Sequence, residues 1–176
     1  MIPPGSTQAN ARWFANLGLP LSAADLRHAR AYLTALGYGS DIRIEPVAGW
    51  REAEQIIRDP NWDRTWWQHE ERERQCLMEH ARALLGASVL LEQLSAATEL
   101  ADDALHAAAA AAAGRGGDAD AALIRAAAGA AAMTLHEAAL ARLARSGPIH
   151  MFMRKYRIIE SGRWPLGVLR GVFHLF

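Results

Sequence analysis

The chain has 176 residues, of which 51% are hydrophobic, and its 19 basic side chains balance its 19 acidic ones. This length and composition predict a single domain over residues 1–176 that can bury its own apolar core. Balanced charge gives no electrostatic reason to bind nucleic acid, and no apolar run is long enough to cross a bilayer. The single cysteine excludes an internal disulfide and leaves histidines and carboxylates as the main ligands of any metal site.

The first twenty residues are marked by proline and glycine and have no clear hydrophobic period, so we expect residues 1–20 to form an extended arm. They also lack the charged start and apolar core of a secretory signal, which favours a cytoplasmic protein. Residues 21–160 are predicted to be mainly helical, and residues 161–176 to form a β-hairpin.

The first predicted helix follows Ser22, a good N-cap, and stops at Gly37. Residues 41–47 alternate apolar and charged side chains, which indicates a short half-buried strand, and Pro46 places it at a sheet edge or a strand end. A short helix over residues 50–59 is closed by Pro60.

Residues 63–113 contain one glycine and no proline, and their apolar period continues throughout. A single straight helix of that span would be roughly 75 Å long, more than a domain of this size is wide. We therefore expect a break, and Ser95 and Thr98 offer the capping chemistry for it. The glycines at 114–117 predict the end of this helical region, with Asp118 or Asp120 as the next N-cap.

Two further helices are predicted, one Ala-rich up to Arg145 and one after Pro148. The alanine tracts indicate close helix packing. After residue 161, Val, Leu and Phe around Arg170-Gly171 predict two short strands and a tight turn. The predicted fold class is mainly α: a helical bundle with a small accessory antiparallel β-sheet, formed by the short N-terminal strand and the C-terminal hairpin.

Charge is unevenly distributed along the chain. From Arg145 onward six basic side chains accompany only one acidic residue, Glu160, while the preceding helices lean acidic. We interpret this as an intramolecular match between oppositely charged parts of one protein.

A polar seam in the first long helix carries the functional interpretation. At about 100° per residue, His69, Glu73, Cys76 and His80 share an arc with Trp62, Trp66 and Leu77, a stripe that should be buried. A second contribution comes from the apolar face of the segment 129–143, which carries His136 with Glu137 at its border. Facing helices that project histidines and carboxylates inward are how bundles build metal centres.

We therefore predict that His69, Glu73, His80 and His136 bind a divalent transition metal, and that Trp62, Trp66, Cys76 and Glu137 line a small-molecule pocket. The sequence lacks the Glu-x-x-His tetrad of di-iron bundles and the His-Glu-x-x-His zinc motif. Taken singly, each histidine fits a hydrogen-bonded core residue better than a metal ligand, and only the coincidence of these residues on one stripe brings the metal-site interpretation close to that alternative. We interpret four interleaved charged residues as a solvated helix face with local ion pairs: Glu70, Glu71, Arg72 and Arg74.

Two function hypotheses remain open, and the sequence does not decide whether the protein is an enzyme. The first is a helical-bundle enzyme or binding protein with a His/Glu-lined pocket for a metal or a small ligand. The second is a non-catalytic helical interaction or assembly module that binds a partner protein or forms a homo-oligomer, with the polar seam in the interface. Nucleic-acid binding through the basic tail is a distant third.

Overall fold

The computed structural model describes residues 12–116 and 119–176. Over these stretches the protein is a bundle of six helices with a three-stranded sheet, which confirms the predicted fold class. None of the described helices is long and apolar enough to span a membrane. The elements are α1 (Ala23–Ala35), β1 (Arg43–Pro46), α2 (Trp50–Arg58), α3 (Arg64–Leu85), α4 (Ala87–Gly116), α5 (Ala121–Leu143), α6 (Met151–Glu160), β2 (Pro165–Leu169) and β3 (Val172–Leu175).

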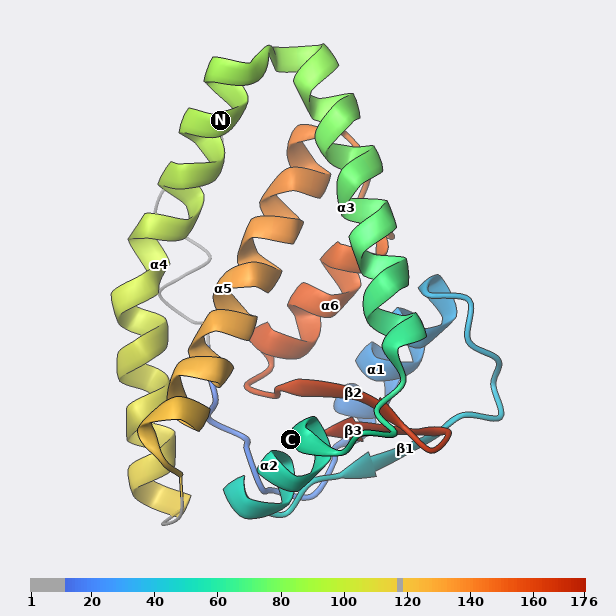
Figure 1. Cartoon of the computed structure of the whole chain (residues 1–176), viewed down its shortest axis with the longest axis vertical. Coiled ribbons are helices and arrows are strands. Elements are labelled where there is room, and N and C mark those ends of the chain that lie inside the picture. The colour runs from blue at the N-terminus through green and yellow to red at the C-terminus, as the bar shows by residue number, and fades with distance from the viewer. Residues whose placement is uncertain (1–11, 117–118) are drawn as a thin grey trace.

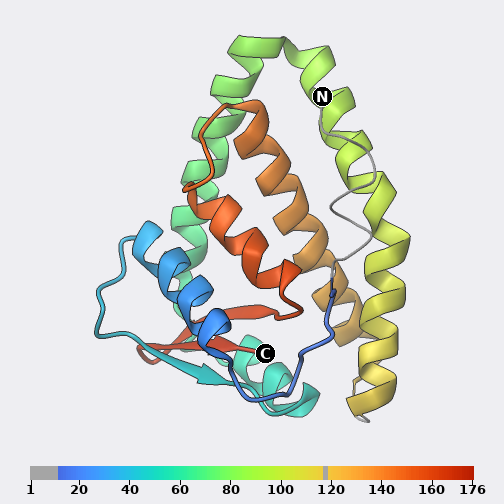
Figure 2. The same cartoon turned by 180° about the vertical axis from the view of Figure 1, so that it is seen from behind.

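The helices α3 and α4 form the two arms of an inverted V, and α5 lies between them (Figure 1). Helix α6 lies on the other side of α5, beside α1, as the view from behind shows (Figure 2). The sheet and α2 lie at the open end of the V. This arrangement brings α1, α3, α5 and α6 together around one part of the core.

The break in the long helical region falls at Gly86, between α3 and α4. Gly86 has φ 79° and ψ 155°, a conformation that side chains strongly disfavour, so the chain turns where glycine allows it. The predicted break at residues 95–98 was wrong. Thr98 lies inside α4, where its hydroxyl donates to the carbonyls of Leu94 and Ser95 in the preceding turn instead of capping a helix end.

Three other predicted helix boundaries are confirmed. Ser22 and Asp25 form a reciprocal capping box at the start of α1, Asp120 caps α5, and α2 ends just before Pro60. The alternative cap at Asp118 lies outside the described residues. Each cap satisfies amide groups that the helix itself leaves unpaired, which is why these boundaries could be predicted from short sequence patterns.

The sheet has the strand order β1-β3-β2 and is mixed. The hairpin β2–β3 is antiparallel as predicted, but β1 runs parallel to β3, so the expectation of a wholly antiparallel sheet was wrong for this strand. Pro46 lies on an edge strand, where its missing N–H costs no ladder hydrogen bond. The C-terminal Phe176 is 1% exposed and exchanges main-chain hydrogen bonds with Trp164.

The described part of the predicted extended arm is folded instead. Residues 13–18 form turns, and Phe14 is 1% exposed. The Asn16 amide donates to the carbonyl of Ser161 at 2.7 Å, which ties this segment to the end of α6. Residues 1–11 of the predicted arm lie outside the described residues.

The alanine tracts pack α4 against α5, as predicted. Ala109, Ala112, Ala127, Ala128 and Ala131 are all buried in one apolar cluster. Small side chains let the two helices approach closely along their lengths. A second cluster joins α1, α3, α6 and the sheet, and the candidate site lies against it.

Candidate functional site

Trp66 and Leu77 are buried on α3, as predicted, whereas Cys76 and His80 of the same stripe are exposed. The side of α3 that faces the core is therefore rotated by roughly 60° from the predicted stripe. The buried residues of α3 are Trp66, Glu70, Leu77 and Ala81. The interpretation of Glu70 as part of a solvated face was therefore wrong, since its side chain is only 2% exposed. A charged group buried this deeply needs charged or hydrogen-bonding partners.

Those partners come from two other helices, α6 and α1, and the cluster extends from Lys155 of α6 to α5. The ammonium group of Lys155 on α6 donates to Glu70 Oε2 at 2.7 Å and to Glu137 Oε2 on α5 at 3.0 Å. The guanidinium of Arg74 on α3 binds the second oxygen of Glu137 and also Glu71, nearer the surface. Glu137 is fully buried.

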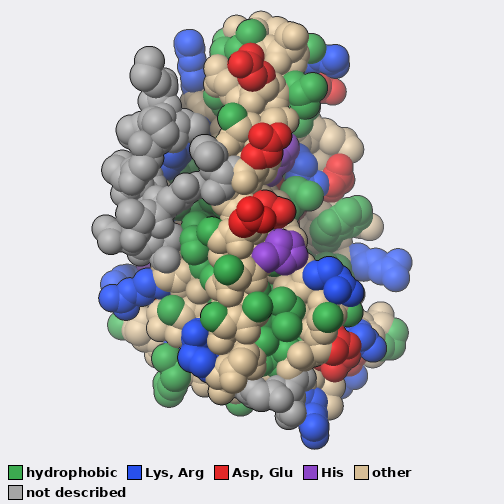
Figure 3. All heavy atoms as spheres, turned by 90° about the vertical axis from the view of Figure 1, so that its left-hand side faces the viewer, with side chains coloured by type: hydrophobic (Ala, Val, Ile, Leu, Met, Phe, Trp, Pro, Cys, Tyr) green, Lys and Arg blue, Asp and Glu red, His purple; other side chains and the backbone are tan. Residues whose placement is uncertain are grey.

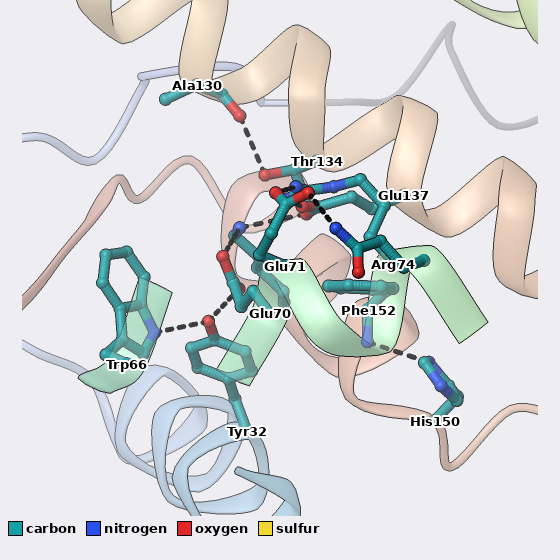
Figure 4. Close-up of polar contacts among 12 residues, drawn as sticks. Tyr32, Trp66, Glu70, Glu71, Arg74, Ala130, Thr134, Glu137, His150 and Phe152 are labelled. Atoms are coloured by element: carbon teal, nitrogen blue, oxygen red, sulfur yellow. Dashed lines mark hydrogen bonds and ion pairs between the residues drawn. The ribbon is translucent and has the colours of Figure 1, made fainter. Parts of the chain in front are cut away.

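Tyr32 on α1 completes the arrangement. Its hydroxyl donates to Glu70 Oε1 and accepts a hydrogen bond of 2.7 Å from the indole nitrogen of Trp66. The ammonium nitrogen of Lys155 also lies 5.7 Å from the centroid of the Trp66 ring, in a cation–π contact. Figure 4 shows Trp66, Tyr32 and Glu70 on one side of this cluster and Arg74 and Glu137 on the other.

We call these six residues the buried charge network: Tyr32, Trp66, Glu70, Arg74, Glu137 and Lys155. It holds two carboxylates and two cations, and every carboxylate oxygen has a donor from the protein itself. Formal charge is thus matched inside the core. The network connects α1, α3, α5 and α6, the four helices that surround it.

Burial and neighbouring charges shift the pKa values of the network in opposing ways. Burial raises the pKa of Glu70, and the nearby charge of Glu137 adds to this, although Lys155 and Tyr32 oppose it. Burial alone would lower the pKa of Lys155, but Glu70 and Glu137 outweigh burial and raise it. Lys155 therefore stays protonated across the neutral range.

The four residues of the predicted metal site are distributed along the edges of α3 and α5. His69 and His136 are half-buried, and His80 is exposed. Burial, with the charge of Arg74 in the same direction, lowers the pKa of His136 despite the nearby Glu137. Among the described residues, no group of three or more His, Cys, Asp or Glu side chains is placed to hold a metal ion.

Glu73 instead contacts a histidine to which the sequence assigned no role. His150 Nε2 lies 3.0 Å from Glu73 Oε1, and His150 Nδ1 accepts a hydrogen bond from the amide of Phe152 at the start of α6. Because Nδ1 is an acceptor, the neutral ring carries its proton on Nε2 and donates to Glu73. This pair anchors the beginning of α6 to α3.

The four residues of the predicted ligand pocket do not share one environment. Trp66 and Glu137 belong to the buried charge network, while Cys76 is exposed. Trp62 packs edge-on against Trp66, with centroids 5.3 Å apart, and its indole nitrogen donates to the carbonyl of Leu166. Gly167 makes room for both rings: a Cβ there would lie 2.8 Å from each of them.

An open hollow of about 260 Å³ lies elsewhere, between the turn after α1 and the hairpin. It is lined by Tyr38, Gly39, Asp41, Ile42, Asp63, Val168 and Gly171. None of the predicted metal or ligand residues lines it. The Asp63 carboxylate accepts hydrogen bonds from the hydroxyl of Tyr38 and from the amide of Thr65 at the start of α3.

Basic side chains of the C-terminal segment form ion pairs with acidic residues elsewhere in the same protein, as predicted. Arg163 pairs with the buried Asp25 of α1, and Arg170 pairs with Asp59. Lys155, the only lysine in the sequence, pairs with Glu70 and Glu137. These contacts account for charges that would otherwise favour an anionic partner.

The sequence held two signals for the network. Trp66, Glu70 and Arg74 follow one another at four-residue spacing, which places them on one side of a helix. The only lysine lies among apolar residues of α6.

Comparison with known proteins adds no further assignment, since no family model, curated protein or solved structure matches the chain.

Proposed function

We propose that the protein is a non-catalytic helical assembly module that associates with copies of itself. In this proposal the buried charge network fixes the packing of α1, α3, α5 and α6, and the surface of the resulting scaffold makes the contacts. The observation that carries the proposal is the saturation of the network: each oxygen of Glu70 and Glu137 already has a donor from the protein.

Saturation weighs against chemistry at these residues. A general acid or base has to reach a substrate atom at hydrogen-bond distance. Glu70, Glu137 and Lys155 are each below a tenth exposed, and their hydrogen-bonding groups face one another. A polar network of this kind can specify one helix arrangement at some cost in stability, as polar core residues do in some helical assemblies.

The surface supports the assembly part of the proposal. Near the bend between α3 and α4, three large aliphatic side chains are well exposed: Leu84 at 43%, Val89 at 42% and Leu91 at 68%. Trp67 on α3 is 50% exposed. Apolar side chains at the centre of a protein contact, with Trp prominent among them, carry much of its binding energy, and a polar or charged rim surrounds them.

Sedimentation velocity from dilute to concentrated protein tests the proposal, and metal analysis of the same untagged sample tests the alternative. We expect the weight-average sedimentation coefficient to rise with concentration and no stoichiometric metal. A protein that stays monomeric at every concentration would overturn the proposal. Stoichiometric zinc or another transition metal that disappears in His136→Ala would establish the metal pocket instead.

A further inference from the structure

We propose that copies of this chain associate head to tail, with the outer face of α4 in one copy against the outer face of α3 in the next. This inference rests on the proposed assembly function and names the two surfaces that would carry it. It comes from the opposite charges of these helix faces.

The outer face of α4 is acidic. Glu92, Glu99, Asp102 and Asp103 are exposed, and no lysine or arginine occurs between residues 87 and 114. At about 100° per residue these four side chains lie within an arc of roughly 100°. Figure 3 shows acidic side chains and a histidine following one another down this side of the molecule.

The outer face of α3 is basic. Arg64, Arg72 and Arg82 are exposed on the side opposite the buried residues of α3, and Glu79 is the one acidic residue among them. In the described part of the chain, the ion pairs of α3 involve Glu70, Glu71, Glu73 and Arg74, and none of these three arginines. Their charges are thus available to a partner.

The two faces match in length as well as in sign. At 1.5 Å per residue, Arg72 and Arg82 are about 15 Å apart along α3, and Glu92 and Asp103 are about 17 Å apart along α4. Each face also has an exposed apolar side chain beside its charges, Trp67 on α3 and Leu91 on α4. Exposed Ala96 between Glu92 and Glu99 lets another helix approach.

The position of the faces determines the kind of assembly. They belong to the two different arms of the V (Figure 1), so each copy offers one acidic and one basic surface. Such a heterologous contact does not close between two copies, and it extends into chains or rings. Exposed charges attract over about 10 Å at 0.1 M salt, so salt should weaken the contact.

A charge-swap experiment tests these surfaces. One variant reverses α3 (Arg72→Glu with Arg82→Glu), and another reverses α4 (Glu99→Lys with Asp103→Lys). All four residues are exposed, so both variants should keep the helical circular dichroism of the native protein. Arg27→Glu with Arg125→Glu, also exposed but on α1 and α5, is the matched control.

We expect each reversed variant to lose the concentration-dependent rise in sedimentation coefficient, while an equimolar mixture of the two regains it. The control should associate like the native protein. If either reversed variant associates as well as the native protein, or if the mixture fails to associate, these surfaces are wrong although self-assembly stands. A native protein that is monomeric throughout would instead contradict the proposed function itself.

Discussion

Lys155 on α6 and Glu70 on α3 are 85 residues apart in the sequence, yet the lysine ammonium donates to the glutamate carboxylate at 2.7 Å in the core. Both side chains are below a tenth exposed. Each charge alone would be strongly disfavoured there, and each is tolerated because the other is present. The contact makes the docking of α6 depend on the orientation of α3.

Replacing Lys155 by methionine should therefore destabilise the protein by about 3–5 kcal/mol, because Glu70 and Glu137 lose their shared cation. The triple variant Glu70→Leu, Glu137→Leu, Lys155→Met should recover most of this loss, since apolar groups of similar size need no charged partner. Urea unfolding followed by circular dichroism measures both. A single variant that costs less than about 1 kcal/mol would contradict a tightly paired network.

Tyr32→Phe should cost about 1–3 kcal/mol, because it removes the donor to Glu70 and the acceptor for the Trp66 indole while both remain buried. Tyr38→Phe is the matched control. Its hydroxyl donates to Asp63 in a half-buried position, so water can replace it and the cost should be smaller. Equal free energies of unfolding for the two variants would show that burial of the hydroxyl does not determine the cost of removing it.

Alkaline conditions should weaken the fold. Glu70 and Glu137 raise the pKa of Lys155 above its ordinary 10.5, so its contribution is complete below that pH and is lost as pH rises through the folded value. Burial and then Glu70 raise the pKa of Tyr32 well above 10, so the unfolded chain ionises first and stability again falls with rising pH.

Urea unfolding from neutral pH to above the ordinary lysine pKa should show this decline. Tyr38 and Tyr156 also have raised pKa values, so part of this loss of stability comes from tyrosines outside the buried charge network. The double variant Tyr32→Phe, Lys155→Met isolates the network, and its stability should fall less steeply with pH. Parallel pH profiles for this variant and the native protein would refute the assignment.

Gly86→Ala should destabilise the bend between α3 and α4 by about 1–3 kcal/mol, because φ 79° with ψ 155° is a backbone conformation almost confined to glycine. A Cβ at Gly86 would meet no atom within 4 Å, so the cost is one of backbone strain. Gly129→Ala is the control: this glycine lies within α5 with equally open surroundings, and alanine there should stabilise by about 0.5–1 kcal/mol. Thermal unfolding should shift in opposite directions for the two.

Ala127→Leu should lower stability by about 1–3 kcal/mol, because Ala127 is fully buried where α5 packs against α4. Ala126→Leu, at the neighbouring exposed position, is the control and should leave the melting temperature almost unchanged. If both variants melt like the native protein, close packing of the alanine tracts does not contribute to stability.

The elements that have local causes could be predicted from the sequence. Ser22 and Asp120 cap helices through bonds to amides three residues away, and Arg170-Gly171 turns the hairpin within two residues. The alanine tracts predicted close helix packing because small side chains have that effect wherever they face a neighbour. All these signals lie within a few residues of the structure that they produce.

The exact side of α3 that faces the core depends on contacts with distant parts of the chain and could not be predicted. The predicted stripe began with Trp62, which precedes α3, and ended with Leu91, which follows the bend at Gly86, so neither reports the phase of this helix. The core face keeps Trp66 and Leu77 but is rotated by roughly 60° from the predicted stripe, enough to bury Glu70 and Ala81 and to expose Cys76 and His80. The partners of Glu70 lie on α1 and α6, and a carboxylate becomes a core residue only once such distant donors are brought to it.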